Sequence, residues 1–197
     1  ASDLIAMKSE FEERDLEIRT LHDGWMMAFR ALENCEEISM DERQAVNRSL
    51  SRFQSANWPN IRSSAYNEMQ ATGTFSRLED NGIKKDIASL YAAFGRDSLA
   101  RLGERNNQLS AGRIIWSHIP FTFESNDPFD NTKITSDMVV FEPLKYCDEL
   151  ALQEKLSLQG AIWEMVDGNR DWLDDSRDFV GQIDSLLERL PAPNPRD

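Results

Sequence analysis

Apolar residues recur every seven positions along the first 35 residues, and this repeat is the strongest constraint on the fold. One series consists of Leu4, Phe11, Ile18, Trp25 and Leu32. A second series, three residues later in each heptad, consists of Met7, Leu21, Ala28 and Cys35, with Arg14 in the remaining place. Charged residues such as Glu12, Glu13 and Arg19 occupy the other faces. Two such series are typical of a helix packed against others along its length, so they predict a long first helix with a buried seam.

Further helix signals follow along the chain. Ser39 and Glu42 have the spacing of a capping box and predict a helix start. Gly73 predicts a helix end, because glycine adopts the left-handed conformation at low cost. Another helix is expected from Asp80 or Asn81 to Trp116, with a bend near Gly95.

The last helix is predicted from about Lys145 to Leu190. Its expected core residues include Leu152, Leu156, Ile162, Trp163, Val166, Leu173, Val180, Ile183 and Leu187. Residues 119–143 show no such pattern and are expected to form one long irregular loop. The predicted fold is therefore all-α: an elongated, mostly antiparallel helical bundle with long first and last helices.

Length and composition are those of a globular chain. Its 197 residues are 40% hydrophobic and 29% charged, which suits one domain over residues 1–190. The remaining residues, 191–197, read PAPNPRD and predict a flexible tail, because proline cannot continue a helix.

The net charge of −13 excludes nucleic acid as the expected partner, since phosphate binding requires a surface rich in Lys and Arg. It also argues against direct docking on an anionic membrane. The sequence contains no run of 18 apolar residues, so any membrane contact is expected only through an anchor outside this chain. The absence of an initiating Met suggests a processed or trimmed chain. An oligomer is compatible with the heptad pattern.

The residues Asp174-Asp175-Ser176-Arg177-Asp178 match the DDxxD pattern that binds Mg²⁺ and diphosphate in helical prenyl-transfer enzymes. Asp174 and Asp178 share a helix face and offer the oxygen ligands that Mg²⁺ prefers. In a chain with 35 acidic residues, a solvated helix face explains the match better. The two histidines, His22 and His118, lack the spacing of a di-iron site. We therefore expect no metal, no cofactor and no catalytic residues.

Trp116, His118, Phe121 and Phe123 lie where the predicted helix gives way to the long loop. Aromatic side chains around a polar group can line a pocket for a small molecule or a peptide. They are the candidate ligand-binding residues, although plugging the end of the bundle is the simpler interpretation.

Cys35 ends the first helix and Cys147 lies near the predicted start of the last. If those helices are antiparallel neighbours, both thiols fall at the same end and can form a disulfide. Such a bond fits an oxidising compartment. The alternative is that Cys35 remains a free thiol and packs as a small hydrophobe.

The residues Ser64-Ala-Tyr66-Asn-Glu68-Met69, then Ala71-Thr-Gly73-Thr-Phe75, followed by Leu78, Asp80, Ile83, Ile87 and Tyr91, carry a family resemblance. Over about 30 residues the chain resembles small bacterial membrane-anchored proteins of unknown function, which have one N-terminal transmembrane helix and a helix–Gly–helix joint. The resemblance implies an extracytoplasmic helical domain with no assigned enzyme activity.

Three functions therefore stand as hypotheses. The first is a non-catalytic extracytoplasmic sensor-like or partner-binding domain of a membrane-anchored protein, on the periplasmic side. The second is a cytoplasmic helical adaptor or complex subunit, and the third is a Mg²⁺-dependent enzyme using Asp174 and Asp178. An apolar segment of about 20 residues upstream of Ala1 would separate the first from the second.

Overall fold

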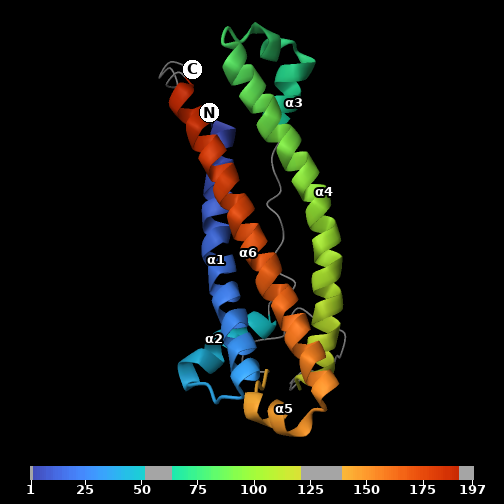
Figure 1. Ribbon diagram of the computed structural model, residues 1–197. Helices are drawn as coiled ribbons and strands as arrows, with labels where there is room; N and C mark the ends of the chain where they lie inside the picture. The colour runs from blue at the N-terminus through green and yellow to red at the C-terminus, as the bar shows by residue number, and fades with distance from the viewer. Residues whose placement is uncertain (1, 52–63, 121–138, 191–197) are drawn as a thin grey trace, which may run out of the picture. The chain divides into compact units, whose positions relative to one another are not determined.

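The computed structural model describes residues 2–51, 64–120 and 139–190, and the regular elements in these ranges are helices (Figure 1). They are α1 (Ser2–Asn34), α2 (Met40–Ser51), α3 (Ser64–Ala71), the 3₁₀ helix η1 (Thr74–Arg77), α4 (Asn81–His118), α5 (Pro143–Glu149) and α6 (Leu152–Arg189). The protein is all-α, with long first and last helices, as predicted. The predicted tail, residues 191–197, lies outside the described ranges.

Local sequence signals set several helix ends where they were expected. Ser39 donates its backbone N–H and its hydroxyl to the Glu42 carboxylate, both at 2.8 Å, which confirms the capping box before α2. Gly73 has a φ of 71° and separates α3 from η1. Asp80 accepts hydrogen bonds from the backbone N–H groups of Gly82 and Ile83 at 2.7 and 3.0 Å, so it caps α4.

The heptad prediction for α1 is confirmed. All five residues of the first series are buried, as are Met7, Leu21 and Ala28 of the second. Glu12, Glu13 and Arg19 are exposed. The a and d positions of α1 therefore face its neighbours over the whole helix.

The chain forms two compact units, and neither is one continuous stretch. The first contains residues 1–16, 58–102 and 174–197, and the second contains 17–57 and 103–173. Helices α1, α4 and α6 each contribute residues to both units. The expectation of a single domain over residues 1–190 stays a prediction.

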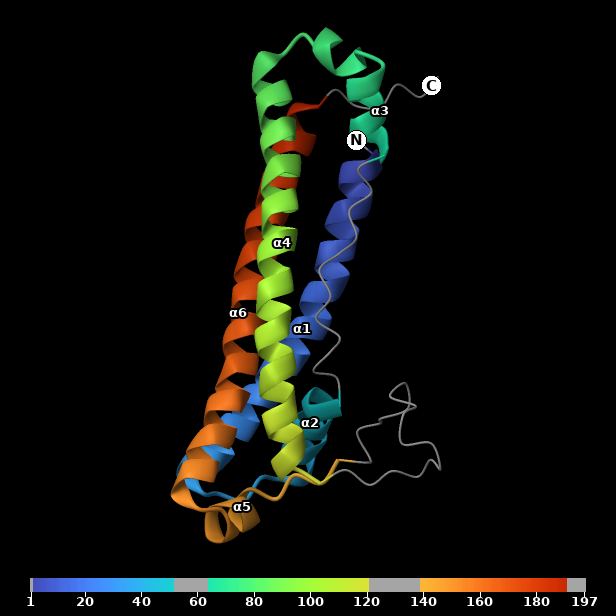
Figure 2. The ribbon, with the colours of Figure 1, turned by 90° about the vertical axis from the view of Figure 1, so that its right-hand side faces the viewer.

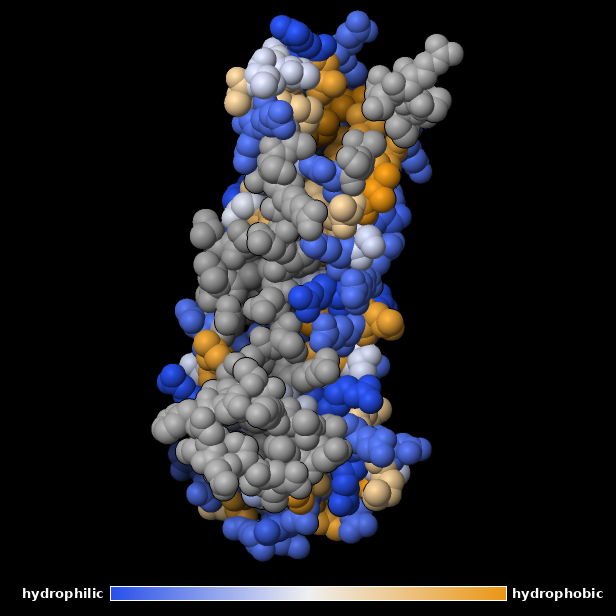
Figure 3. All heavy atoms as spheres, turned by 180° about the vertical axis from the view of Figure 1, so that it is seen from behind, coloured by the Kyte–Doolittle hydropathy of each residue, from blue (hydrophilic) through white to orange (hydrophobic). Residues whose placement is uncertain are grey.

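In the first unit, α6 runs antiparallel to α1 (Figures 1 and 2). Lys8 pairs with Asp184 at 2.6 Å, and Ser176 donates a hydrogen bond to Asp15 at 2.6 Å, so residue numbers rise along α1 as they fall along α6. Aromatic rings join three helices, because Phe11 of α1 stacks on Phe179 of α6 and both contact Phe94 of α4 edge-on. Figure 3 shows hydrophobic residues gathered near the α3 end of this unit, among mainly hydrophilic surface.

The α3–η1 joint packs on α4 within the same unit. The ring of Tyr66 stacks on Tyr91 with centroids 4.2 Å apart, and Phe75 meets Tyr66 edge-on at 5.5 Å. These contacts explain the helix–Gly–helix sequence structurally: Gly73 reverses the chain so that aromatic residues on both sides of it can pack together.

In the second unit, α2 packs closely on α1. The Ser49 hydroxyl donates to the Leu21 carbonyl at 2.9 Å, and the backbone of Ala45 approaches Gly24. The rings of Phe29 on α1 and Trp163 on α6 lie 5.1 Å apart. Helix α5 also belongs to the second unit. Its Tyr146 is buried, and so is Phe141, which lies just before the helix.

The prediction of one continuous last helix from about Lys145 is wrong at its beginning. Leu150 is extended, with φ −80° and ψ 137°, so α5 ends at Glu149 and α6 begins at Leu152. The Ala151 N–H then donates to the Glu154 carboxylate at 3.0 Å, which satisfies one free donor at the new helix start. Neither Gly160 nor Gly168 interrupts α6.

Three expected core residues of this helix are also wrong: Leu152, Leu156 and Trp163 are exposed. Ile162, Val166 and Ile183 of the expected set are buried, and the buried series of α6 runs along the face that contains Ile162 and Ile183. It consists of Leu158, Ile162, Met165, Asn169, Trp172, Ser176, Phe179, Ile183 and Leu186, spaced alternately by four and three residues.

Candidate functional site

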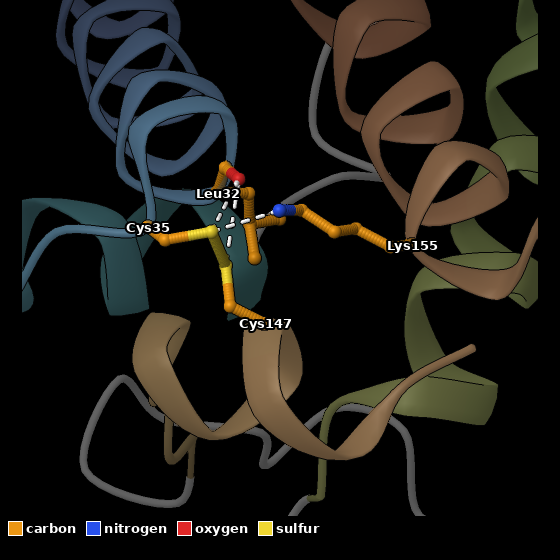
Figure 4. Close-up of a disulfide and its surroundings, with 4 residues drawn as sticks. All are labelled: Leu32, Cys35, Cys147 and Lys155. Carbon is orange, nitrogen blue, oxygen red and sulfur yellow. Dashed lines mark hydrogen bonds between the residues drawn. A yellow bond between two sulfur atoms is a disulfide. The ribbon is translucent and has the colours of Figure 1, made fainter. Parts of the chain in front are cut away.

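The two cysteines are joined by a disulfide in the second unit (Figure 4). Cys35 directly follows α1 and has a φ of 53°, while Cys147 lies within α5. Their Cα atoms are 5.9 Å apart, and the bond closes a sequence separation of 112 residues. The sequence placed both thiols at the same end, and the contact between α1 and α5 brings them together.

Lys155 reaches from α6 to this disulfide (Figure 4). Its Nζ lies 2.8 Å from the Cys35 Sγ, so an ammonium group stands next to one sulfur of the pair. If the bond is reduced by an external thiol, a thiolate leaving from Cys35 is stabilised there by the positive charge. Sequence reasoning missed Lys155, because no spacing rule connects it with residues 120 positions away.

Buried side chains fix α5 against the segment before it. The Tyr146 hydroxyl donates to the Val140 carbonyl at 3.0 Å, and its ring lies 5.8 Å from that of Phe141. Burial raises the pKa of the Tyr146 hydroxyl to about 12, so this donor keeps its proton at neutral pH. Cys147 is therefore presented by a well-packed helix.

Of the four candidate ligand-binding residues, Trp116 and His118 fall in the described part of the chain. Trp116 is half-buried, and the His118 Nδ1 lies 2.8 Å from the Ile114 carbonyl and 3.0 Å from the Ser117 hydroxyl. These partners belong to the same helical turn, which accounts for the orientation of the imidazole. Phe121 and Phe123 lie outside the described residues, so the proposed pocket stays a prediction.

Asp174 and Asp178 lie on α6 within the first unit. Asp174 pairs with Arg177 at 3.1 Å, and both side chains are exposed. Asp178 and Arg177 line a groove of about 530 Å³ between α4 and α6, together with Asp86, Ser89 and Gln182. Among the described residues, no three or more His, Cys, Asp or Glu side chains are grouped so that they could hold a metal ion.

Burial also raises the pKa of the Tyr91 hydroxyl, whose ring stacks on Tyr66. Three further pKa shifts belong to surface groups with structural partners. Hydrogen bonds from Ser39 lower the pKa of Glu42, and those from Ile83 and Gly82 lower the pKa of Asp80. The pKa of Lys8 is raised, chiefly by its hydrogen bond to Asp184. Each of these shifts is explained by a helix cap or an interhelical ion pair.

None of the helices, over the residues that the structure describes, is both long enough and apolar enough to span a bilayer.

Comparison of this chain with protein-family models, with curated proteins and with solved structures finds no match.

Proposed function

We propose that this chain is a non-catalytic, extracytoplasmic, sensor-like or partner-binding helical domain of a membrane-anchored protein. The observation that carries the proposal is the disulfide between Cys35 and Cys147. Disulfides persist in oxidising compartments and are rare where thiol reductants keep cysteines reduced. A bond that ties the end of α1 to α5 is best suited to a protein that folds outside the cytoplasm.

The chemistry of the described side chains supports a non-catalytic role. Catalytic groups usually show perturbed pKa values within a cleft. Here the lowered pKa values of Glu42 and Asp80 come from helix capping, and the raised pKa of Tyr146 comes from burial in the core. The acidic surface, with a net charge of −13 over the whole chain, favours a protein partner over nucleic acid.

Thiol trapping in bacterial cells tests the location. Cells producing the full-length protein are quenched with acid, denatured without reductant and treated with a large maleimide-coupled polymer that slows migration on a gel. We expect an unshifted band that gains two polymers after reduction. The Cys35→Ser variant, which leaves one thiol, calibrates the single shift.

Two polymers bound without reduction would contradict the proposal and favour the cytoplasmic adaptor or complex subunit. Protease protection tests independently on which side of the inner membrane the domain lies. A protease added outside the inner membrane should digest the domain if it is extracytoplasmic. The domain should stay intact if it is cytoplasmic.

A further inference from the structure

The backbone at Cys35 is fixed by contacts that do not depend on the disulfide. Cys35 follows α1 with a φ of 53°, and the backbone N–H of Glu36 donates to the Ala31 carbonyl at 3.1 Å. A left-handed residue bridged by a hydrogen bond of this kind is the Schellman motif, which closes many helices. Leu32, in the last turn of α1, is buried. The end of α1 therefore sets the position of Cys35.

Helix α5, which carries Cys147, is also held without the S–S bond. The Tyr146 ring is buried, and its hydroxyl donates to the Val140 carbonyl at 3.0 Å. The backbone N–H of Val140 in turn donates to the Pro120 carbonyl at 3.4 Å, which ties this segment to the residues just after α4. Because these contacts remain when the bond is opened, Cys147 stays close to Cys35 in the reduced protein.

Each sulfur has a polar neighbour that suits its reduced form (Figure 4). The Lys155 Nζ lies 2.8 Å from the Cys35 Sγ, and the Leu32 carbonyl oxygen lies 3.6 Å from the Cys147 Sγ. The ammonium group stabilises a thiolate on Cys35, and the carbonyl accepts a hydrogen bond from an S–H group on Cys147. Both cysteines are half-buried, so neither is sealed in the core.

We infer that Cys35 and Cys147 form a reversible thiol–disulfide exchange site, which a small thiol opens and the folded protein closes again. The inference rests on the proposed sensor-like function and names small thiols as the class of ligand. Disulfides that serve only as structural cross-links resist reduction by such thiols. Here the contacts around both cysteines provide for the reduced state as well as for the oxidised one.

Reduction takes two exchange steps. A small thiolate attacks the Cys147 sulfur, the S–S bond breaks, and its electron pair leaves with Cys35 as a thiolate beside Lys155. A second small thiolate attacks the small-thiol sulfur of the mixed disulfide and releases Cys147, which takes up a proton. Two small thiols are thereby oxidised to their disulfide, and the protein disulfide is reduced to a dithiol. The remaining proton passes to water.

Reclosure uses the same groups. In the mixed disulfide, the Cys35 thiolate attacks the Cys147 sulfur and expels the small thiolate. This step is intramolecular, and the Schellman motif and the buried Tyr146 ring already hold the two residues together. The helices do not have to rearrange for the bond to form again.

The test is a redox titration of the whole purified chain. The protein is equilibrated without oxygen in mixtures of reduced and oxidised glutathione at about pH 8, where cysteine thiolates are populated. One series starts from the disulfide form and the other from the reduced form. Acid quenching and the maleimide-coupled polymer count the thiols, and circular dichroism records the helix content. Both series should reach the same ratio of disulfide to dithiol in each mixture, with the same helical signal throughout.

Two variants should shift this ratio in opposite directions. Tyr146→Ala removes the ring that anchors α5 in the dithiol form, so the ratio should move at least about tenfold toward the dithiol. Lys155→Gln removes the charge beside the Cys35 thiolate, so the ratio should move severalfold toward the disulfide. The controls are Tyr91→Ala, which removes a half-buried ring of the first unit, and Lys145→Gln on α5. Neither control should shift the ratio measurably.

Four results would overturn the inference. They are loss of the helical signal on reduction, different final ratios from the two starting forms, a bond that stays closed in every mixture, or an unchanged ratio in both Tyr146→Ala and Lys155→Gln. If Tyr146→Ala does not fold, the native titration and the Lys155→Gln shift decide. The titration uses purified protein, whereas thiol trapping in cells reports the compartment, so failure of this inference and failure of the proposed location can be distinguished.

Discussion

Gly24 shows how one missing side chain can set the contact between two helices. It is buried in α1 where α2 packs, and a Cβ added there would lie 2.5 Å from the Ala45 carbonyl oxygen and closer still to the Ser49 hydroxyl. The Ser49 hydroxyl uses this close approach to reach the Leu21 carbonyl. A glycine within a helix costs free energy, and here the packing of α2 offsets that cost.

Replacing Gly24 by Ala should therefore destabilise the protein by about 1–3 kcal/mol, the usual cost of overpacking, because backbone atoms of α2 must move. The matched control is Gly181→Ala on α6, where an added Cβ meets nothing within 4 Å. That change should stabilise by roughly 0.5–1 kcal/mol through helix propensity. Urea denaturation measures both, and equal effects of the two substitutions would show that α2 does not pack against Gly24.

Lys155 gives a second prediction at the residue scale. When an external thiolate attacks the Cys147 sulfur, the S–S bond breaks and Cys35 leaves as a thiolate beside the Lys155 ammonium. Lys155→Gln should slow reduction of the folded protein by glutathione about fivefold, as expected for the loss of roughly 1 kcal/mol of charge interaction. The control is Lys145→Gln. It removes a lysine of α5 that pairs with Glu142, the residue before that helix.

Alkylation of the free thiol followed by mass mapping identifies which sulfur was attacked. The native protein should carry glutathione mainly on Cys147. Unchanged rates in Lys155→Gln, with glutathione divided equally between both cysteines, would show that the Lys155 charge does not direct the exchange.

At the scale of whole helices, apolar periodicity and terminal hydrogen bonds act together. Both α1 and α6 bury residues at alternating spacings of four and three, which keeps one seam facing the neighbouring helices. The α6 seam includes a buried polar residue in each unit, Asn169 and Ser176. Ser176 donates to the half-buried Asp15, and a polar contact of this kind within a seam favours one register over its alternatives.

The Glu42 carboxylate at the start of α2 should make the free energy of unfolding depend on pH. The pKa of Glu42 is lowered from 4.5 because the ionised carboxylate accepts hydrogen bonds from Ser39. The unfolded chain therefore binds this proton at higher pH than the folded protein does. The capping contribution is present above pH 4.5 and is lost as the pH falls through the lower folded-state pKa.

Thermal melts between pH 7 and roughly pH 3 should show that the Glu42→Gln variant loses less stability on acidification than the native protein does. Glu36→Gln, which removes an exposed carboxylate just before α2, is the control. An identical slope in the native protein and the Glu42→Gln variant would mean that the cap is not formed in solution.

At the scale of the whole molecule, one covalent bond links two parts of the second unit that are distant in sequence. The disulfide joins positions 112 residues apart and holds α5 against the end of α1. Helices α1, α4 and α6 also cross from one unit to the other, so each unit depends on segments distant in sequence. Cross-linking distant segments restricts the unfolded chain far more than the folded one.

Replacing both cysteines by Ser should lower the free energy of unfolding by up to about 4.7 kcal/mol, the chain-entropy value for a loop of this size. Chemical denaturation of the native protein with and without reductant should reproduce the difference. A double variant as stable as the oxidised protein would show that the bond contributes nothing to folding.

Short-range physics allowed the sequence alone to predict much of this protein. The heptads of α1, the caps at Ser39 and Asp80, and the turn at Gly73 depend on helix geometry and on hydrogen bonds between residues close in the chain. Those features have the same cause in any fold, and they led to the all-α prediction. The cysteine positions likewise suggested a pairing that the structure contains.

Only the tertiary structure decided which apolar face of α6 is buried. Leu152, Leu156 and Trp163 fit a helical repeat as well as Leu158 and Ile162 do, and periodicity cannot choose between two apolar faces of one helix. The break at Leu150, the approach of α2 to Gly24 and the position of Lys155 also depend on partners that are remote in sequence. Burial is a property of the neighbours that a side chain meets, and those neighbours are fixed only when the whole chain has folded.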